Sequence, residues 1–353
     1  MFLVVGILVG AIGLYLTYAS NAATAPPAST KAKITGLLDR KGLPNANYVT
    51  YNGKPLVRNF VITVNWKDIE KDEGTFTFGP IDDYLDDAAT LGSQVRLRII
   101  AGAGSPDWAI DRAGRIPNWY DPTEKANYAI PAFWKPSYQQ AYKTFLTRLS
   151  AQYDSNPIIS EVTMAMCGTV YAEPLVRQSS IAANKTAAIA AGYTYSLDYS
   201  CLTNEIDLFD ARSGIPAAGK LFKNTRVTFA VNPYQAFNPP MGRTAAQDTL
   251  NLMSYCRSRL GPRCVLGNNS IRSPAKSDGG YSAVYNKQKS LGKPLYYQTA
   301  QPDLIGNWQA TLQWAVDQGA SSVELNSAYY DPANPYDKAI LATYAEKLRN
   351  NKY

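Results

Sequence analysis

Short apolar runs recur along most of this chain and alternate with segments whose apolar residues are three or four positions apart. Val95–Ala101 is apolar except for two arginines, and Glu161–Cys167 contains neither glycine nor proline. Runs of this kind are typical of parallel strands that are buried on both faces. The segments Ile81–Leu91 and Pro136–Tyr153 instead have the spacing of amphipathic helices.

Repetition of this alternation predicts the fold. Each gap between the expected strands is long enough for a crossover helix, which parallel strands require. Eight such units predict an α/β protein with a (β/α)8 TIM barrel over residues 34–353. The expected strands are 34–38, which has the weakest apolar pattern, 60–66, 95–101, 161–167, 226–232, 264–268, 295–299 and 322–326.

The N-terminal residues have a different character. Residues 2–18 carry no charge, and their length lies between that of a signal-peptide core and that of a membrane span. We expect residues 1–20 to be a transmembrane helix or signal-anchor segment, and residues 21–33, rich in Ala, Pro, Ser and Thr, to be a linker. The barrel is then expected to be exported, either secreted or membrane-anchored at the cell surface through this segment only.

Composition narrows the chemistry. The absence of histidine removes Ser-His-Asp and Cys-His catalysis, so that acid–base work falls to carboxylates, Tyr, Lys or Cys. The net charge is +7, but the basic residues are scattered, and we expect no nucleic-acid partner, no cofactor and no metal. The 25 Tyr and 6 Trp suit a carbohydrate ligand, because their rings combine an apolar face with a polar tip.

Four cysteines are present, and none forms a CxxC pair. Cys256 and Cys264 flank a Gly-Pro turn and could form a disulfide in an exported domain. Cys167 is expected to be a packed strand residue, because no neighbouring base would activate its thiol.

Two glutamates lie where a barrel would use them. Glu173 follows the strand 161–167, and carboxylates beyond strand ends are placed to act on substrates; its alternative role is that of a surface charge. Glu324 lies within an apolar strand, where a carboxylate needs a partner or a function. Its alternative role is an ion pair with Arg96 or Arg98, one of which is expected to point into the barrel.

The segment 66–82, together with 95–102 and 105–108, resembles the N-terminal catalytic barrel of family-42-type β-galactosidases and related clan A glycoside hydrolases. Those enzymes carry W-x-x-(I/L)-E-x-x-x-G-x-(F/Y)-x-(F/W) after the second strand and a P-x-W loop after the third. The resemblance covers about residues 60–108 and is loose elsewhere. The matching residues are Trp66, Ile69, Glu70, Gly74, Phe76, Phe78, Pro106 and Trp108.

The resemblance implies a retaining, β-galactosidase-like glycosidase with an acid/base Glu at the fourth strand and a nucleophilic Glu at the seventh. Glu173 takes the first position, although Ala172 precedes it where the family has Asn. The seventh-strand position holds Gln298, whose amide cannot form a glycosyl ester. Glu324 could then be the seventh-strand nucleophile if the strand count is off by one. Alternatively, Glu173 and Glu324 could form an inverting pair about 6.5–9.5 Å apart, or the barrel could bind sugar without cleaving it.

Aromatic and amide side chains near the strand ends complete the predicted site. Aromatic rings there can stack on sugars or simply pack in the core, while amides recognise hydroxyls and an inward arginine can keep a carboxylate ionised. We expect a glycoside hydrolase for an extracellular oligo- or polysaccharide, with Glu173 as general acid/base and Glu324 as second carboxylate, or a non-catalytic carbohydrate-binding barrel. The candidate substrate-binding residues are Trp66, Arg98, Trp108, Asn232, Asn268, Tyr297, Gln298 and Tyr329.

Overall fold

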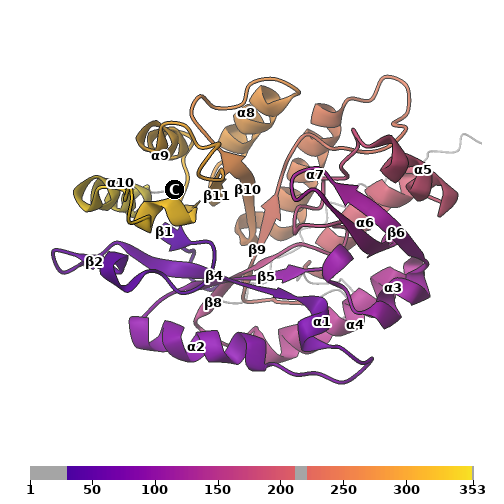
Figure 1. The fold of residues 1–353 in the computed structure, drawn as a ribbon, viewed down its shortest axis with the longest axis horizontal. Coiled ribbons are helices and arrows are strands. Elements are labelled where there is room, and N and C mark those ends of the chain that lie inside the picture. Colours follow the sequence, from indigo (N-terminus) through magenta and orange to yellow (C-terminus); the bar gives the residue numbers. More distant parts are fainter. Residues whose placement is uncertain (1–29, 211–220, 352–353) are drawn as a thin grey trace, which may run out of the picture.

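The computed structural model describes residues 30–210 and 221–351, and in these ranges eight strands form a closed barrel. The strands are β1 (Gly36–Asp39), β4 (Val57–Asn65), β5 (Val95–Ile100), β8 (Ile159–Thr163), β9 (Arg226–Ala230), β10 (Cys264–Ile271), β11 (Leu295–Thr299) and β12 (Ser322–Leu325). Each strand is parallel to both neighbours, and β1 closes the ring by pairing with β4 and β12. Figure 1 shows the strands at the centre with the helices around them. The predicted (β/α)8 barrel is therefore confirmed.

Helices on the outside of the barrel connect successive strands. They are α1 (Trp66–Ile69), α2 (Gly79–Leu91), α3 (Asp107–Ala113), α4 (Pro136–Tyr153), α5 (Ala182–Ala190), α6 (Tyr195–Leu208), α7 (Ala245–Leu260), α8 (Tyr281–Leu291), α9 (Trp308–Asp317) and α10 (Lys338–Asn350). In α2, a proline in the first turn and Gly92 in left-handed conformation at the C-cap mark the two ends. The helix predicted over Pro136–Tyr153 has the expected bounds.

Two small hairpins were not expected from the apolar pattern. The strands β2 (Thr50–Tyr51) and β3 (Lys54–Pro55) pair between β1 and β4, and β6 (Arg115–Asp121) pairs with β7 (Ala126–Pro131) between α3 and α4. Figure 1 shows β6 outside the ring of barrel strands, where it contacts α5. The turn of the β6–β7 hairpin contains Glu124.

The fourth barrel strand is shorter than predicted. Residues 161–167 are all buried, but β8 ends at Thr163. Beyond that point the backbone N–H groups of Ala165 and Met166 donate to the side chain of Glu205 rather than to a neighbouring strand. A buried apolar run therefore continues after the ladder has ended, because a side chain satisfies the backbone groups instead.

All four cysteines of the chain are paired. The expected bond between Cys256 and Cys264 is present. Cys167, interpreted above as a packed strand residue, is buried beyond β8 and is bonded to Cys201 of α6, 34 positions away. Sequence spacing gave no sign of this second bond, because only the fold brings the two residues together.

The predicted membrane segment, residues 1–20, lies outside the described residues, as does most of the predicted linker at 21–33. In the two described ranges, no helix has both the length and the apolar character needed to cross a membrane.

Candidate active site

A cavity of about 710 Å³ opens at the carboxyl ends of the barrel strands. In barrel enzymes the reacting groups lie at this end, where strands pass into loops. Residues at the ends of β4, β5, β10 and β11, and in the loops after β1, β8 and β9, line it. Its charged and amide-bearing side chains are Arg40, Lys41, Arg98, Glu124, Glu173, Asn232, Gln235, Asn269, Arg272, Lys276, Gln298 and Gln301.

Glu173 is the half-buried carboxyl group of this cavity. Asn232 Nδ2 donates a hydrogen bond of 2.8 Å to Glu173 Oε2, and Asn269 also bonds to the carboxyl group. Burial raises the pKa of Glu173, and these hydrogen bonds and the charges of Arg98 and Lys276 oppose that rise without cancelling it. The group therefore keeps its proton to a higher pH than an ordinary glutamate, as a general acid must.

The amide of Asn232 has a single orientation that satisfies its neighbours. Its Oδ1 accepts from Asn268 Nδ2 at 3.0 Å and from the Tyr281 hydroxyl at 3.2 Å. Asn268 is itself fixed, because its amide donates to the Val231 carbonyl and accepts from Tyr285. With its oxygen occupied, Asn232 must turn its amino group toward Glu173, and this holds the carboxyl group in place.

The loop that carries Glu173 is fastened at its start by a buried glutamate. Glu205 of α6 accepts from the backbone N–H groups of Ala165 at 2.6 Å and Met166 at 2.7 Å. The bond from Cys167 to Cys201 joins the same loop to the same helix. Burial raises the pKa of Glu205 to about 7, although the backbone hydrogen bonds act in the opposite direction.

Two further contacts fix the loop against the loops that follow the neighbouring strands β5 and β9. Gly102 has a positive φ of 58°, and a Cβ atom there would lie 2.0 Å from the carbonyl oxygen of Thr169. Only glycine allows this approach of the loops after β5 and β8. On the other side, Gln235 donates its backbone N–H to the Leu175 carbonyl and accepts from the Arg177 N–H. Although Glu173 lies well beyond the strand end, its loop is therefore held toward the cavity.

Glu205 makes the stability of this region depend on pH. Its folded pKa of about 7 lies above the unfolded value of about 4.3, so that between these values the folded state binds more protons than the unfolded state. Its stabilising contribution is complete below about pH 4.3 and is lost as pH rises through 7, by an amount on the order of 3 kcal/mol. We expect Glu205→Gln to remove this loss.

The measurement is urea unfolding of wild type and Glu205→Gln at intervals from about pH 4.5 to 8, because only the difference between them isolates this carboxyl group. Two parallel curves of stability against pH would contradict the assignment. The exposed Glu346 of α10, replaced by glutamine, serves as the control for the same chemical change at the surface.

Glu324 does not belong to the lining of the described cavity. It lies on β12, is fully buried, and both of its oxygens accept from Arg98, at 2.7 and 2.8 Å. It also pairs with Arg96, which in turn pairs with Glu161 of β8. Burial would raise the pKa of Glu324, but the charges of Arg98 and Arg96 outweigh it and hold the pKa below its usual range. The ion pair proposed above as its alternative role is present.

The strand order shows which barrel strands carry Glu324 and Gln298. Because β12 is the eighth barrel strand, the idea that Glu324 belongs to the seventh is wrong. The seventh strand, β11, carries Gln298, which lines the cavity. Arg96 and Arg98 both point into the barrel, rather than one of them, because residues two apart on a strand share a face.

The structure brings together four of the predicted site residues around the described cavity: Glu173, Arg98, Asn232 and Gln298. Asn268 lies behind Asn232 and orients it. The four predicted aromatic residues are absent from the described lining, and their packing alternative is the one observed. Trp66 packs on Trp108 and three other rings, Tyr297 faces Trp314 outside the barrel, and Tyr329 donates to Asp39.

Several lining residues escaped the sequence analysis. Asn269 lies near the end of the sixth strand, Arg272 directly follows that strand, Lys276 lies farther along the same loop, and Arg40 directly follows the first strand. Basic side chains that immediately follow an apolar strand were a usable signal. Tyr281 offered no such signal, because it reaches the cavity from the first residue of α8.

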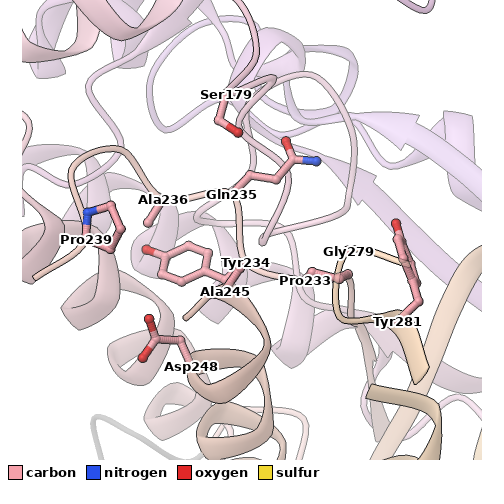
Figure 2. A pocket seen from close by; sticks show the side chains of 10 residues that line it. All are labelled: Ser179, Pro233, Tyr234, Gln235, Ala236, Pro239, Ala245, Asp248, Gly279 and Tyr281. Carbon is pink, nitrogen blue, oxygen red and sulfur yellow. The ribbon is translucent and has the colours of Figure 1, made fainter. Parts of the chain in front are cut away.

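A second cavity of about 410 Å³ adjoins the first. The two share Gln235 and Tyr281 among their lining residues. Figure 2 shows that its other side chains come from the segment after β9, from the start of α7 and from Ser179. The two cavities therefore meet at Gln235 and Tyr281.

No protein-family model matches this chain, and no curated protein matches its sequence. The catalytic domain of β-amylase from Paenibacillus polymyxa shares its structure with a TM-score of 0.57 at 12% identity, over 92% of this chain and 100% of that chain. Endo-glycoceramidase II from Rhodococcus sp. gives 0.49 at 12% identity over 92% and 81%, and β-galactosidase from the psychrophilic Marinomonas ef1 gives 0.41 at 10% over 89% and 59%. The β-amylase match, together with the closed ring of parallel strands, shows that this chain has the (β/α)8 barrel fold that the resemblance of residues 60–108 implied.

Proposed function

We propose that this protein is a glycoside hydrolase in which Glu173 is the general acid that protonates the departing glycosidic oxygen. The observation that carries the proposal is a carboxyl group of raised pKa, held by Asn232 inside the 710 Å³ cavity at the carboxyl ends of the barrel strands. Cleavage of a glycosidic bond needs such a proton donor near neutral pH. The β-amylase that shares the fold supports the same class of reaction.

Glu324 is a poorer candidate for the second catalytic carboxylate than the sequence suggested. A nucleophile or base needs a free oxygen that faces the substrate, whereas both oxygens of Glu324 are bonded to Arg98 in the barrel interior. Glu124, in the turn of the β6–β7 hairpin, is the other acid among the described lining residues. We assign it the activation of the attacking water, which corresponds to an inverting mechanism.

The substrate is proposed to be an oligo- or polysaccharide outside the cell. The adjoining cavity of about 410 Å³ supports a chain of several sugar units. The bonds Cys167–Cys201 and Cys256–Cys264 support export, because disulfides persist in oxidising compartments. A membrane anchor at residues 1–20 remains part of this proposal.

A second candidate function is carbohydrate binding without cleavage. It is favoured by Gln298, a neutral amide at the seventh-strand position, and by the engagement of Glu324 in ion pairs. In this case Glu173 would accept or donate hydrogen bonds to sugar hydroxyls and would transfer no proton.

One experiment separates the two functions. The purified protein is incubated with a panel of aryl glycosides and of cell-surface polysaccharides, and the release of aglycone or of reducing ends is measured, with Glu124→Gln alongside. We expect cleavage of at least one member and its loss in Glu124→Gln. Binding of a panel member with no release of product would contradict the hydrolase and favour the binding barrel.

A further inference from the structure

The wall of the 710 Å³ cavity carries an excess of positive charge. Among the described lining residues, five are basic and two are acidic. The acidic pair is Glu173 and Glu124. The basic set is Arg40, Lys41, Arg98, Arg272 and Lys276.

The basic side chains differ in the ion pairs and hydrogen bonds that they form within the protein. The charge of Arg98 is balanced by Glu324, and Arg40 donates to the Thr299 carbonyl at 3.0 Å and to Gln301 at 2.5 Å. Arg272 and Lys276 form no ion pair with any described residue. Arg272 Nε is buried without a hydrogen-bond partner, and Lys276 Nζ lies 4.7 Å from the centre of the Tyr281 ring.

Arg272 and Lys276 repel each other in the free protein, and the carboxylates of Glu173 and Asp278 offset this repulsion without forming an ion pair with either cation. Burial lowers the pKa of Lys276, and the neighbouring charge of Arg272 lowers it further, while Glu173 and Asp278 act in the opposite direction. A bound anion would remove this repulsion and supply the missing hydrogen-bond acceptor. Arg272 Nε therefore has an unused hydrogen bond to give, and both cations have positive charge that an anion in the cavity could neutralise.

We infer that Arg272 and Lys276 bind the acidic substituent of an anionic saccharide, a carboxylate or a sulfate ester, whose glycosidic oxygen lies at Glu173. The inference rests on the proposed function of this cavity and specifies its substrate class.

Tyr281 links the two parts of the site. Its ring faces Lys276, and its hydroxyl donates to Asn232, the residue that holds Glu173. The anion site and the proposed acid are therefore connected through one tyrosine and one amide. A sugar whose acidic group sits on Arg272 and Lys276 would be anchored beside the carboxyl group that acts on it.

Binding rather than turnover tests the inference. The Glu173→Gln variant, which preserves the cavity and cannot supply the proton, is titrated by calorimetry at about 0.15 M salt, where long-range attraction is largely screened. The probes are a galacturonic acid oligosaccharide, a sulfated carrageenan oligosaccharide and a neutral cello-oligosaccharide of similar length. We expect at least one acidic probe to bind tenfold or more tightly than the neutral one.

The same titrations are repeated with Arg272→Gln and Lys276→Gln added together. These two replacements should lower the affinity for the acidic probe at least tenfold and change the affinity for the neutral probe by no more than about twofold. The matched control adds Lys71→Gln and Lys185→Gln, which remove the same charge from exposed sites. The identity of the preferred acidic probe distinguishes a carboxylate from a sulfate site.

Three outcomes would overturn the inference: no binding of either acidic probe, equal affinity for all three probes, or equal weakening by the control pair. Because no cleavage is involved, these outcomes are separate from failure of the hydrolase. An acidic probe that depends on Arg272 and Lys276 but is never cleaved by the wild-type protein would uphold the anion site and contradict the proposed reaction.

Discussion

Replacing Glu173 by glutamine is expected to lower turnover about 10²–10⁴-fold, the usual contribution of general acid–base catalysis. Glutamine has the same shape and can still accept from Asn232, but it has no proton to give. Because burial already raises the pKa of Glu173 and so disfavours its ionised form, the neutral substitute should leave the free energy of unfolding unchanged or slightly higher.

The dependence on leaving group identifies the acid role specifically. A strongly acidic phenol departs from an aryl glycoside as its phenolate and needs no proton from the enzyme. Glu173→Gln should therefore lose much less activity on a dinitrophenyl glycoside than on an unactivated glycoside. Wild-type activity should also fall as pH rises through the raised pKa of Glu173, and this limb should be absent in the variant. Full activity of Glu173→Gln on an unactivated substrate would remove the assignment, and Glu346→Gln is the surface control.

Glu324→Gln is expected to reduce the free energy of unfolding by about 3–5 kcal/mol, the cost of breaking a buried ion pair from one side. The variant removes the carboxylate that pairs with Arg98 and leaves Arg96 with Glu161 alone. A guanidinium group keeps its proton in proteins, so the positive charge stays buried. Equilibrium unfolding in urea measures the loss.

A second replacement shows whether charge is the cause. Adding Arg98→Met to Glu324→Gln leaves the balanced pair of Arg96 and Glu161, and we expect it to restore at least half of the lost stability. Under the alternative, in which Glu324 is a catalytic carboxylate, Glu324→Gln would instead lose activity with a stability change below about 1 kcal/mol. That result would return the second carboxylate to β12.

The contrast between these two glutamates separates site from scaffold. Both lie at barrel strands or the loops that follow them, and from sequence alone they formed a pair. The structure places the carboxyl group of Glu173 against the amide of Asn232, and it pairs the carboxyl group of Glu324 with Arg96 and Arg98. Glu173 is therefore suited to lose and regain a proton, while Glu324 is suited to remain ionised.

By itself, the sequence determined the fold and the general position of the site. Apolar runs such as Val95–Ile100 can be satisfied only by burial on both faces, and their spacing allows a helix between each pair, so periodicity was sufficient for the barrel. Because carboxyl ends of parallel strands meet at one end of a barrel, Glu173, Asn232 and Gln298 could also be placed there in advance.

Only the tertiary structure decided which side chains meet. Arg96 and Glu324 are 228 positions apart, and Cys167 and Cys201 are 34 apart. Arg272 and Lys276 line the same cavity as Glu173, yet neither forms an ion pair with a residue that the structure describes. The aromatic residues near strand ends pack on rings and side chains of other elements, which only the fold brings to them. Whether a ring stacks on sugar or on another ring, and whether a carboxylate is paired or free, depends on neighbours that are distant in sequence.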